Sequence, residues 1–139
     1  MLDTNVVSEA LRPHHNTSAN VRTWLQFHGE SRFFLSRISE TEIKAGAYGR
    51  RDPVRERRLL ESWNALSKRL TLLEFTHMAS DSAARFSAKR NLAGRPVSFA
   101  DAAIAGIALA NNCALATRNT KDFEGSDLTL INPFDPSGE

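Results

Sequence analysis

The chain has 139 residues, enough for one domain with a sizeable hydrophobic core. Its content of 41% hydrophobic and 24% charged residues is typical of globular proteins and argues against both disorder and a membrane protein. The net charge is only +2, and the first residues, MLDTN, contain no apolar signal-peptide segment. We therefore expect a single domain over residues 1–139 that works in the cytoplasm.

Short apolar segments alternate with helical patterns along the chain. We expect strands at the start (MLD) and over residues 33–36, 70–75, 113–117 and 128–132. Between them we expect helices over residues 6–11, 18–28, 39–48, 53–68, 77–92 and 98–111. This alternation predicts a parallel sheet with helices on both faces. In such folds, ligands bind at the carboxyl ends of the strands.

Four acidic residues lie close to those predicted strand ends. Asp3 ends the first strand, Glu42 follows the second, and Asp122 follows the fourth. Asp101 begins the apolar helix in VSFADAAIAGI, where an unpaired buried carboxylate would be costly. These acids are far apart in sequence, but a parallel sheet would bring them to one crevice.

Each acid also has a purely structural interpretation. Ser39 with Glu42, and Ser98 with Asp101, have the spacing of a capping box at a helix start. Asp3 could cap the helix that follows it, and Asp122 could be a surface turn residue. Taken singly, each of these interpretations is as good as a functional one.

As a set, the acids favour a divalent-metal site, because several carboxylates in one crevice repel one another unless a cation lies among them. Mg²⁺ and Mn²⁺ prefer oxygen ligands, and phosphodiester hydrolysis uses such ions. The sequence has no Gly-rich phosphate loop, HExxH, CxxC or GxSxG motif, so nucleoside triphosphatase, zinc protease and serine hydrolase functions lack support.

Basic residues are clustered, which makes a polyanionic partner plausible. The clusters comprise Arg50, Arg51, Arg55, Arg57 and Arg58; Lys89, Arg90 and Arg95; and Arg118 with Lys121. The alternative is that they are solvated faces of helices.

Four segments resemble successive motifs of the PIN-domain ribonucleases, and most closely the VapC-type toxins of bacterial toxin–antitoxin pairs, including the FitB-like branch. The segments are LDTNVVSEALRP, LSRISETEIKAG, SFADAAIAGIALANNCALATRNTKDFEG and INPF. The resemblance implies a three-layer α/β/α domain with a mainly parallel sheet of about five strands. It also implies Mg²⁺- or Mn²⁺-dependent endoribonuclease activity on an RNA such as tRNA or rRNA.

The resemblance further implies inhibition by a VapB-like antitoxin, contact with operator DNA only through that antitoxin, and homodimers within larger toxin–antitoxin complexes. No membrane partner is expected. The implied catalytic and metal-binding acids are Asp3, Glu42 and Asp101. Residues expected to support them are Thr4, Asn5, Thr117 and Asn119.

Two positions depart from the family pattern. Many relatives have an acid where this chain has Asn119, so Asp122 is expected to complete the catalytic and metal-binding set. Only two residues precede Asp3, which leaves either missing residues or an unusually short first strand. The Asn119 substitution also keeps open a catalytically weak PIN domain that acts as a binding module or co-repressor with its antitoxin. A haloacid dehalogenase would have a second Asp where this chain has Asn5, two residues after Asp3. A receiver domain would have an acidic pair before its phosphorylated Asp and a Lys at a strand end, and the sequence shows neither.

Overall fold

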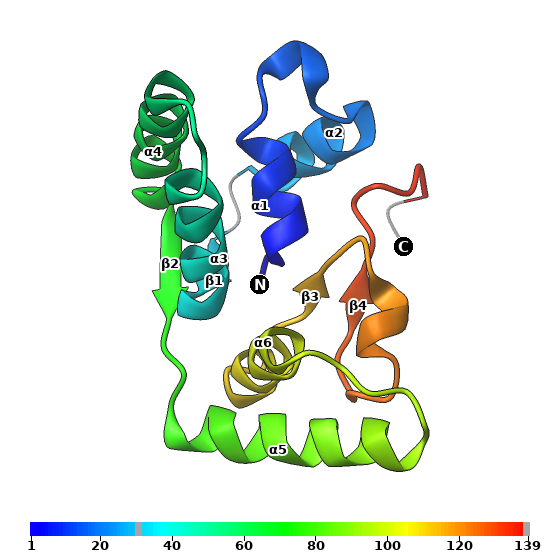
Figure 1. Cartoon of the computed structure of the whole chain (residues 1–139). Helices are drawn as coiled ribbons and strands as arrows, with labels where there is room; N and C mark the ends of the chain where they lie inside the picture. Colours follow the sequence, from blue (N-terminus) through cyan, green and yellow to red (C-terminus); the bar gives the residue numbers. More distant parts are fainter. Residues whose placement is uncertain (30–31, 138–139) are drawn as a thin grey trace.

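A narrow parallel sheet runs through the middle of the computed structural model, which describes residues 1–29 and 32–137 (Figure 1). Its strands are β1 (Phe33–Ser36), β2 (Leu70–Leu73), β3 (Leu115–Ala116) and β4 (Leu130–Ile131). The pairs β1–β2 and β3–β4 are parallel. In place of a longer first strand, Leu2 alone bridges in parallel to Leu35 and Ala116. The resulting order is β2, β1, Leu2, β3, β4.

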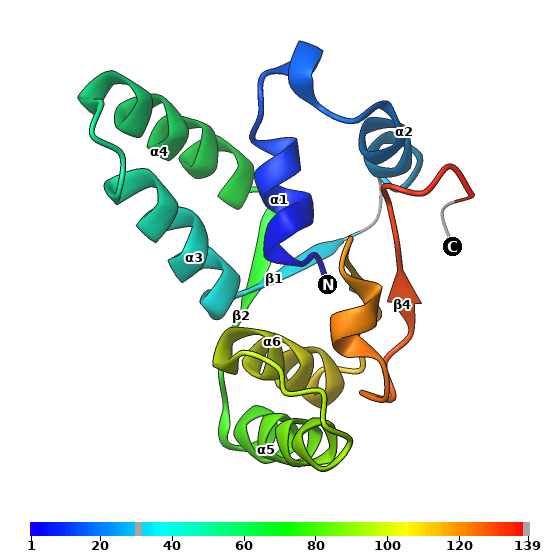
Figure 2. The same ribbon diagram turned by 45° about the vertical axis from the view of Figure 1, so that its right-hand side comes forward.

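Six α-helices flank this sheet within the described residues. They are α1 (Thr4–Ala10), α2 (Ala19–Phe27), α3 (Arg37–Tyr48), α4 (Pro53–Ser67), α5 (His77–Leu92) and α6 (Phe99–Ala110), with short 3₁₀ helices η1 (His14–Asn16) and η2 (Thr120–Phe123). Figure 2 shows α3 and α4 as a projecting hairpin beside α1, and α5 with α6 on the other side of the sheet. None of these helices is both long and apolar enough to cross a membrane.

Two hydrophobic cores lie on opposite faces of the sheet, which makes the fold three layers deep. One core contains Val6, Ile43 and Trp63 from α1, α3 and α4. The other contains Phe86 and Ile104 from α5 and α6. Because successive residues of a strand point to opposite faces, β3 and β4 each place one residue in the first core and one in the second. The expected three-layer α/β/α architecture with a parallel sheet is confirmed.

All six α-helices were predicted from the sequence, with boundaries that differ by at most two residues, whereas η1 and η2 were not predicted. The main difference is at the start of α3, where Ser36 is the N-cap and its Oγ accepts a hydrogen bond from the Ser39 amide at 2.9 Å. Ser39 is therefore buried inside the first turn, and the predicted capping box of Ser39 with Glu42 is wrong. Glu42 lies in the second turn of α3, so helix capping does not account for it.

The strand order reverses at the centre of the sheet. Chain connections run from Leu2 outward to β1 and β2, and then return to β3 and β4 on the other side of Leu2. Doubly wound sheets bind ligands beyond the carboxyl ends of the strands at such a reversal. Asp3 and Thr117 directly follow the two adjacent strand positions there, and the Asp3 amide donates to the Ala116 carbonyl at 2.9 Å.

Candidate metal and phosphodiester site

Asp3 is buried at the carboxyl end of the central strand position and caps α1. Its Oδ1 accepts from the Thr4 amide at 2.7 Å. Its Oδ2 accepts from Asn5 Nδ2 at 2.7 Å and from Thr117 Oγ1 at 2.6 Å. The capping interpretation is therefore correct as local geometry, but the two bonds to Oδ2 come from side chains at the reversal point. Together the three bonds fix the orientation of the carboxylate.

The pKa of Asp3 is raised, mainly because its carboxyl group is buried. Burial contributes most, while the hydrogen bonds from Thr117 and Thr4 act in the opposite direction. The negative charges of Asp101 and Glu42 raise the pKa of Asp3 further. The fold thus places the charges of Glu42 and Asp101, which are far from Asp3 in the sequence, near enough to affect the Asp3 carboxyl group.

Glu42 reaches the site from α3 through Thr4. Thr4 Oγ1 donates a hydrogen bond to Glu42 Oε2, and Glu42 forms no ion pair within the described residues. Glu40, two residues earlier on α3, is different: its carboxylate pairs with Arg37 and Lys44, each at 2.7 Å. This difference supports the choice of Glu42 and the exclusion of Glu40.

Asp101 reaches the site from the first turn of α6. The Ser98 hydroxyl accepts from the Asp101 amide at 3.0 Å and donates to Asp101 Oδ2 at 2.8 Å. The predicted capping arrangement of Ser98 is confirmed, and it also holds the carboxylate itself. Ser98 therefore both begins the helix and sets the direction of its acid.

A hydrogen-bond network links the acids to the loop after β3. Thr117 Oγ1 accepts from Asn5 Nδ2 at 3.2 Å and from the Asn119 amide at 3.0 Å, and Asn5 Oδ1 accepts from the Arg118 amide at 3.1 Å. Thr4, Asn5 and Thr117 thus all contact the acids directly. Asn119 contacts the network through its backbone, and its side chain is free to face solvent.

The structure does not join Asp122 to the other three acids. Asp122 lies in η2 and lines a separate cavity of about 430 Å³ with Arg118, Asn119 and Lys121. It is not among the charges that shift the pKa of Asp3. Its role as a fourth ligand stays a prediction.

The donor set fits a divalent cation that keeps part of its water shell. No Lys, Arg or His in residues 1–29 and 32–137 forms an ion pair with Asp3, Glu42 or Asp101. Within the same residues, no three His, Cys, Asp or Glu side chains stand close enough to form a ready-made metal centre. Mg²⁺ needs only one or two carboxylates directly and contacts others through water, so the two observations are compatible.

Sequence analysis missed Glu9, a buried acid on α1. Its carboxylate accepts from the Ser18 amide at 2.7 Å and pairs with Arg12 at 3.2 Å and Arg118 at 3.6 Å. Burial acts to raise its pKa, but the Ser18 and Arg12 hydrogen bonds and the charges of Arg12 and Arg118 lower it overall. The Arg118 guanidinium also lies 4.0 Å from the centre of the Phe134 ring. By pairing with Arg118, Glu9 helps to hold the loop after β3 in place. Only the Glu9–Arg12 spacing was visible in the sequence.

Comparisons with known proteins agree with this geometry. Residues 1–125 match the family model described as PIN domain. The chain is 36% identical to plasmid stability protein StbB of Pseudomonas syringae, covering 97% of this chain and 98% of that protein. It is 33% identical to VapC ribonuclease Y4jK of Sinorhizobium fredii, covering 99% of both. It also superposes on the DNA-bound VapBC of Salmonella typhimurium with a TM-score of 0.81 at 25% identity, covering 96% of each chain.

Proposed function

The chain belongs to the PIN-domain family, and from this premise we propose that it is the toxin of a type II toxin–antitoxin pair and hydrolyses RNA with Mg²⁺ or Mn²⁺. The observation that carries the proposal is Asp3, a buried carboxylate fixed by three hydrogen bonds where the strand order reverses. The charges of Glu42 and Asp101 lie near enough to raise its pKa. Similarity to a VapC ribonuclease along nearly the whole chain supports the same activity.

The residues of this chain have distinct tasks in that proposal. Asp3 is the fixed ligand: three of the roughly four acceptor positions of its carboxylate are occupied by hydrogen bonds, which leaves about one position for a cation. Glu42 and Asp101 approach from different helices, and each is steadied by one hydroxyl, from Thr4 and Ser98 respectively. Such anchoring keeps ligands in place and tunes the affinity for the ion.

A bound divalent cation would polarise the phosphate and make water nucleophilic at neutral pH. Asp3, Glu42 and Asp101 would hold that cation, directly or through water, and we propose that Asp122 or Asn119 assists from the loop after β3. Thr117 keeps the Asp3 carboxylate facing the crevice and, through its bond from the Asn119 amide, keeps the loop beside it.

We also propose that a VapB-like antitoxin inhibits the protein and that the pair, with the toxin dimeric, binds operator DNA through the antitoxin in the cytoplasm. A solved relative is a DNA-bound VapBC assembly, which supports this arrangement. The crevice itself suggests how inhibition works: a basic side chain of the antitoxin would pair with the acids and take the place of the cation.

A second candidate is a weakly active domain that serves mainly as co-repressor. The observation in its favour is Asn119, whose side chain brings no charge to the site. The three retained acids favour catalysis.

RNA cleavage by antitoxin-free protein tests the proposal. We expect cleavage with Mg²⁺ or Mn²⁺, no cleavage with EDTA, and a loss of at least about 100-fold in Asp3→Asn and Asp101→Asn, as expected when a catalytic metal is weakened. Equal cleavage by these variants would remove the catalytic assignment. A wild-type protein that cleaves no RNA would favour the co-repressor.

A further inference from the structure

Arg90 is buried near the end of α5 and has no carboxylate partner. It is only 9% exposed, and it forms no ion pair within residues 1–29 and 32–137. Its Nε is buried and has no hydrogen-bond partner among the same residues. A buried guanidinium without a counter-charge is costly, and a well-packed apolar side chain is often as stable or more stable in such a place. Packing alone therefore does not explain this cation.

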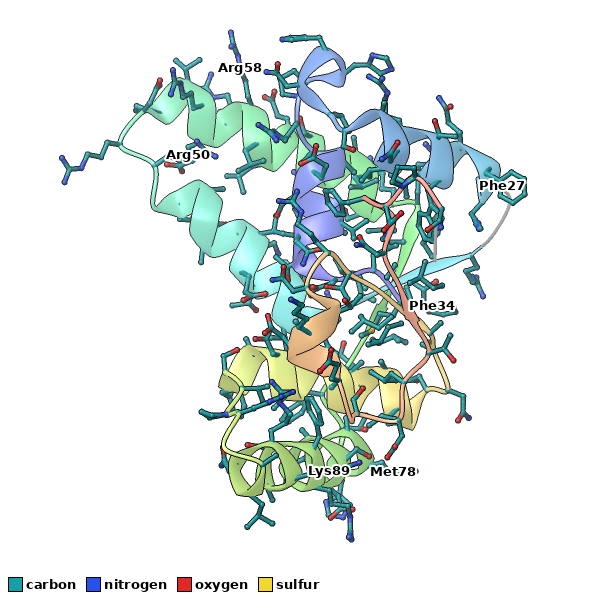
Figure 3. All side chains as sticks on the ribbon, turned by 90° about the vertical axis from the view of Figure 1, so that its right-hand side faces the viewer. Phe27, Phe34, Arg50, Arg58, Met78 and Lys89 are labelled. Carbon is teal, nitrogen blue, oxygen red and sulfur yellow. The ribbon has the colours of Figure 1, made fainter. Side chains whose placement is uncertain are left out.

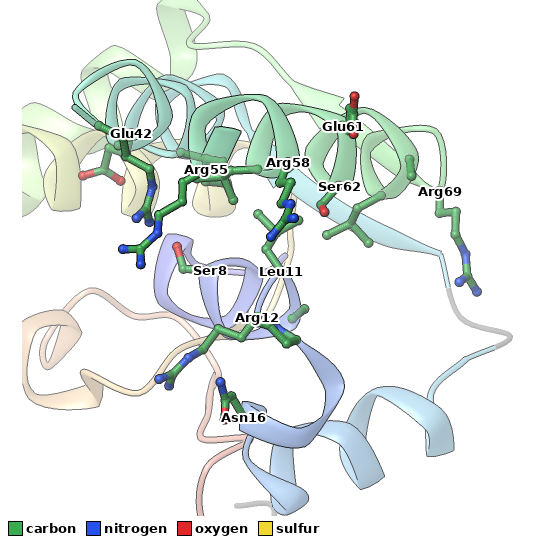
Figure 4. A pocket seen from close by; sticks show the side chains of 18 residues that line it. Ser8, Leu11, Arg12, Asn16, Glu42, Arg55, Arg58, Glu61, Ser62 and Arg69 are labelled. Atoms are coloured by element: carbon green, nitrogen blue, oxygen red, sulfur yellow. The ribbon is translucent and has the colours of Figure 1, made fainter. Parts of the chain in front are cut away.

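Other arginines of the chain stand in a different environment. Arg55 and Arg58 extend from α4 into an open groove of about 1300 Å³ between α4 and α1 (Figure 4). Figure 3 shows Arg50 and Arg58 on the projecting hairpin, well away from Lys89, the neighbour of Arg90 on α5. The three groove arginines are exposed, so water can solvate their charge. Arg90 depends on groups of the protein instead.

The Arg90 guanidinium contacts the backbone of η2 and of the residue after it. Its Nη1 donates to the Lys121 carbonyl at 3.4 Å and to the Glu124 carbonyl at 3.5 Å. Both bonds are long, but the donor is charged and partly shielded from water, which strengthens such interactions. One nitrogen with two N–H groups thus reaches carbonyls on either side of Asp122 and Phe123.

Phe123 anchors the same segment from its inner side. It is 1% exposed and belongs to the same hydrophobic core as Phe86, which lies one turn before Arg90 on α5. Residues four apart share one face of a helix. The same face of α5 therefore provides an apolar contact for the side chain of η2 and hydrogen bonds for its backbone.

The Lys121–Asp122 peptide group connects this anchor to the acid site. Its carbonyl accepts from the guanidinium, and its amide donates to the Asn119 carbonyl at 3.0 Å. The Asn119 amide donates to Thr117 Oγ1 at 3.0 Å, and Thr117 Oγ1 donates to Asp3 Oδ2 at 2.6 Å. Hydrogen bonds and one short stretch of backbone therefore run from α5 to the buried carboxylate.

We infer that Arg90 is a positioning residue for Asp122: it holds η2 so that the Asp122 carboxylate stays beside Asn119, in the loop that also carries Thr117, and assists cation binding from there. The inference rests on the proposed function, because it takes Asp122 to assist a cation held by the other acids. Arg90 itself acts only through the backbone of η2.

The shortness of η2 makes such an anchor necessary. A single 3₁₀ turn has few hydrogen bonds of its own, and its last carbonyls need partners from outside the turn. Without the guanidinium, the carbonyls of Lys121 and Glu124 lose this partner, and Asp122 lies between them. The competing interpretation is that Arg90 only stabilises the fold, and the tests below separate the two.

Three substitutions on α5 distinguish positioning from stability. Arg90→Met removes the charge and the donors but keeps an unbranched side chain that can pack, whereas Arg90→Lys keeps the charge. Arg85→Met is the matched control: it removes the same charge from the same helix at a side chain that is 79% exposed. Urea denaturation shows that each variant is folded, and we expect Arg90→Met to be about as stable as wild type.

The first measurement is amide hydrogen exchange without metal. The Asp122 and Ser126 amides donate to the carbonyls of Asn119 and Phe123, so their exchange reports opening of η2 and its end. We expect both to exchange about tenfold faster or more in Arg90→Met, less so in Arg90→Lys, and as in wild type in Arg85→Met. Unchanged exchange in Arg90→Met would overturn the inference.

The second measurement is Mn²⁺ affinity by calorimetry, in the wild-type and Asp122→Asn backgrounds. Arg90→Met should weaken binding by about tenfold in the first background and by less than about twofold in the second, because its effect passes through Asp122. Equal weakening in both backgrounds would indicate a merely structural role and overturn the inference. Faster exchange with unchanged Mn²⁺ affinity would overturn it as well.

Failure of the proposed function gives a different result. Wild-type protein that binds no Mn²⁺ and cleaves no RNA would refute the proposed function, together with the part of the inference that concerns the cation. The exchange measurement needs no metal, so it decides in either case whether Arg90 holds η2.

Discussion

Gly106 lies where α6 packs tightly against α5, and replacing it tests how α6 is held. A Cβ at Gly106 would lie 2.8 Å from both the Cβ and the backbone nitrogen of Ala83, and closer still to the Ala79 carbonyl oxygen. Two of these atoms belong to the α5 backbone, so no side-chain rotation relieves the overlap. The helices must separate, which typically costs about 1–3 kcal/mol and sometimes more.

Gly106→Ala should therefore lower the free energy of unfolding by about 2 kcal/mol, although alanine itself favours a helix by about 1 kcal/mol. Gly46→Ala is the matched control: it also lies inside a helix, but with open space around it, and should raise stability by about 0.5–1 kcal/mol. Urea denaturation followed by circular dichroism measures both. Because α6 carries Asp101, we also expect RNA cleavage to fall in Gly106→Ala alone. A Gly106→Ala protein as stable as wild type would refute this account of the α5–α6 contact.

Two further predictions concern side chains that support the site. Ser98→Ala removes both hydrogen bonds between Ser98 and Asp101, so it should lower the free energy of unfolding in urea by about 1 kcal/mol and reduce cleavage. Ser98→Thr should keep most of the stability and most of the cleavage. Unchanged cleavage in Ser98→Ala would show that Asp101 needs no anchor. Glu9→Gln should cost about 1–3 kcal/mol at neutral pH. Folding lowers the pKa of Glu9, so its contribution to the free energy of unfolding is present above the unfolded pKa of 4.5 and is lost as the pH falls through the folded pKa. The stabilities of wild type and Glu9→Gln should therefore converge in acid. A stability difference that stays constant with pH would contradict this.

The helices and the layer arrangement could be predicted because their signals are local. Apolar periodicity located each helix, and alternation with short strands predicted the parallel sheet. The start of α3 could not be decided in this way. Ser36 and Ser39 both fit a cap position, and only the burial of Ser39 against the sheet decides between them.

Part of the site could also be predicted, because parallel strands place their carboxyl ends together. Asp3 and Thr117, which directly follow adjacent strand positions, meet for that reason. The position of the Asp122 carboxylate depends on the path of η2, and no periodic pattern in the sequence specifies that path. The lining of the largest described groove was only partly predictable. Arg50, Arg55 and Arg58 form a cluster in the sequence, whereas Arg12 and Arg69 join them only when α1 packs beside α4.

We propose that Asp3, Glu42 and Asp101 bind a divalent cation on which RNA cleavage depends. The most direct measurement is calorimetric titration of Mn²⁺ into wild type, Glu42→Gln and Glu40→Gln, with RNA cleavage measured on the same samples. Both substitutions remove one charge from α3, but Glu40 is already paired with Arg37 and Lys44. We expect Glu42→Gln to weaken Mn²⁺ binding by about 10–100-fold and to lose cleavage, while Glu40→Gln binds and cleaves like wild type. Equal Mn²⁺ affinity in all three proteins, or equal loss in both variants, would contradict it.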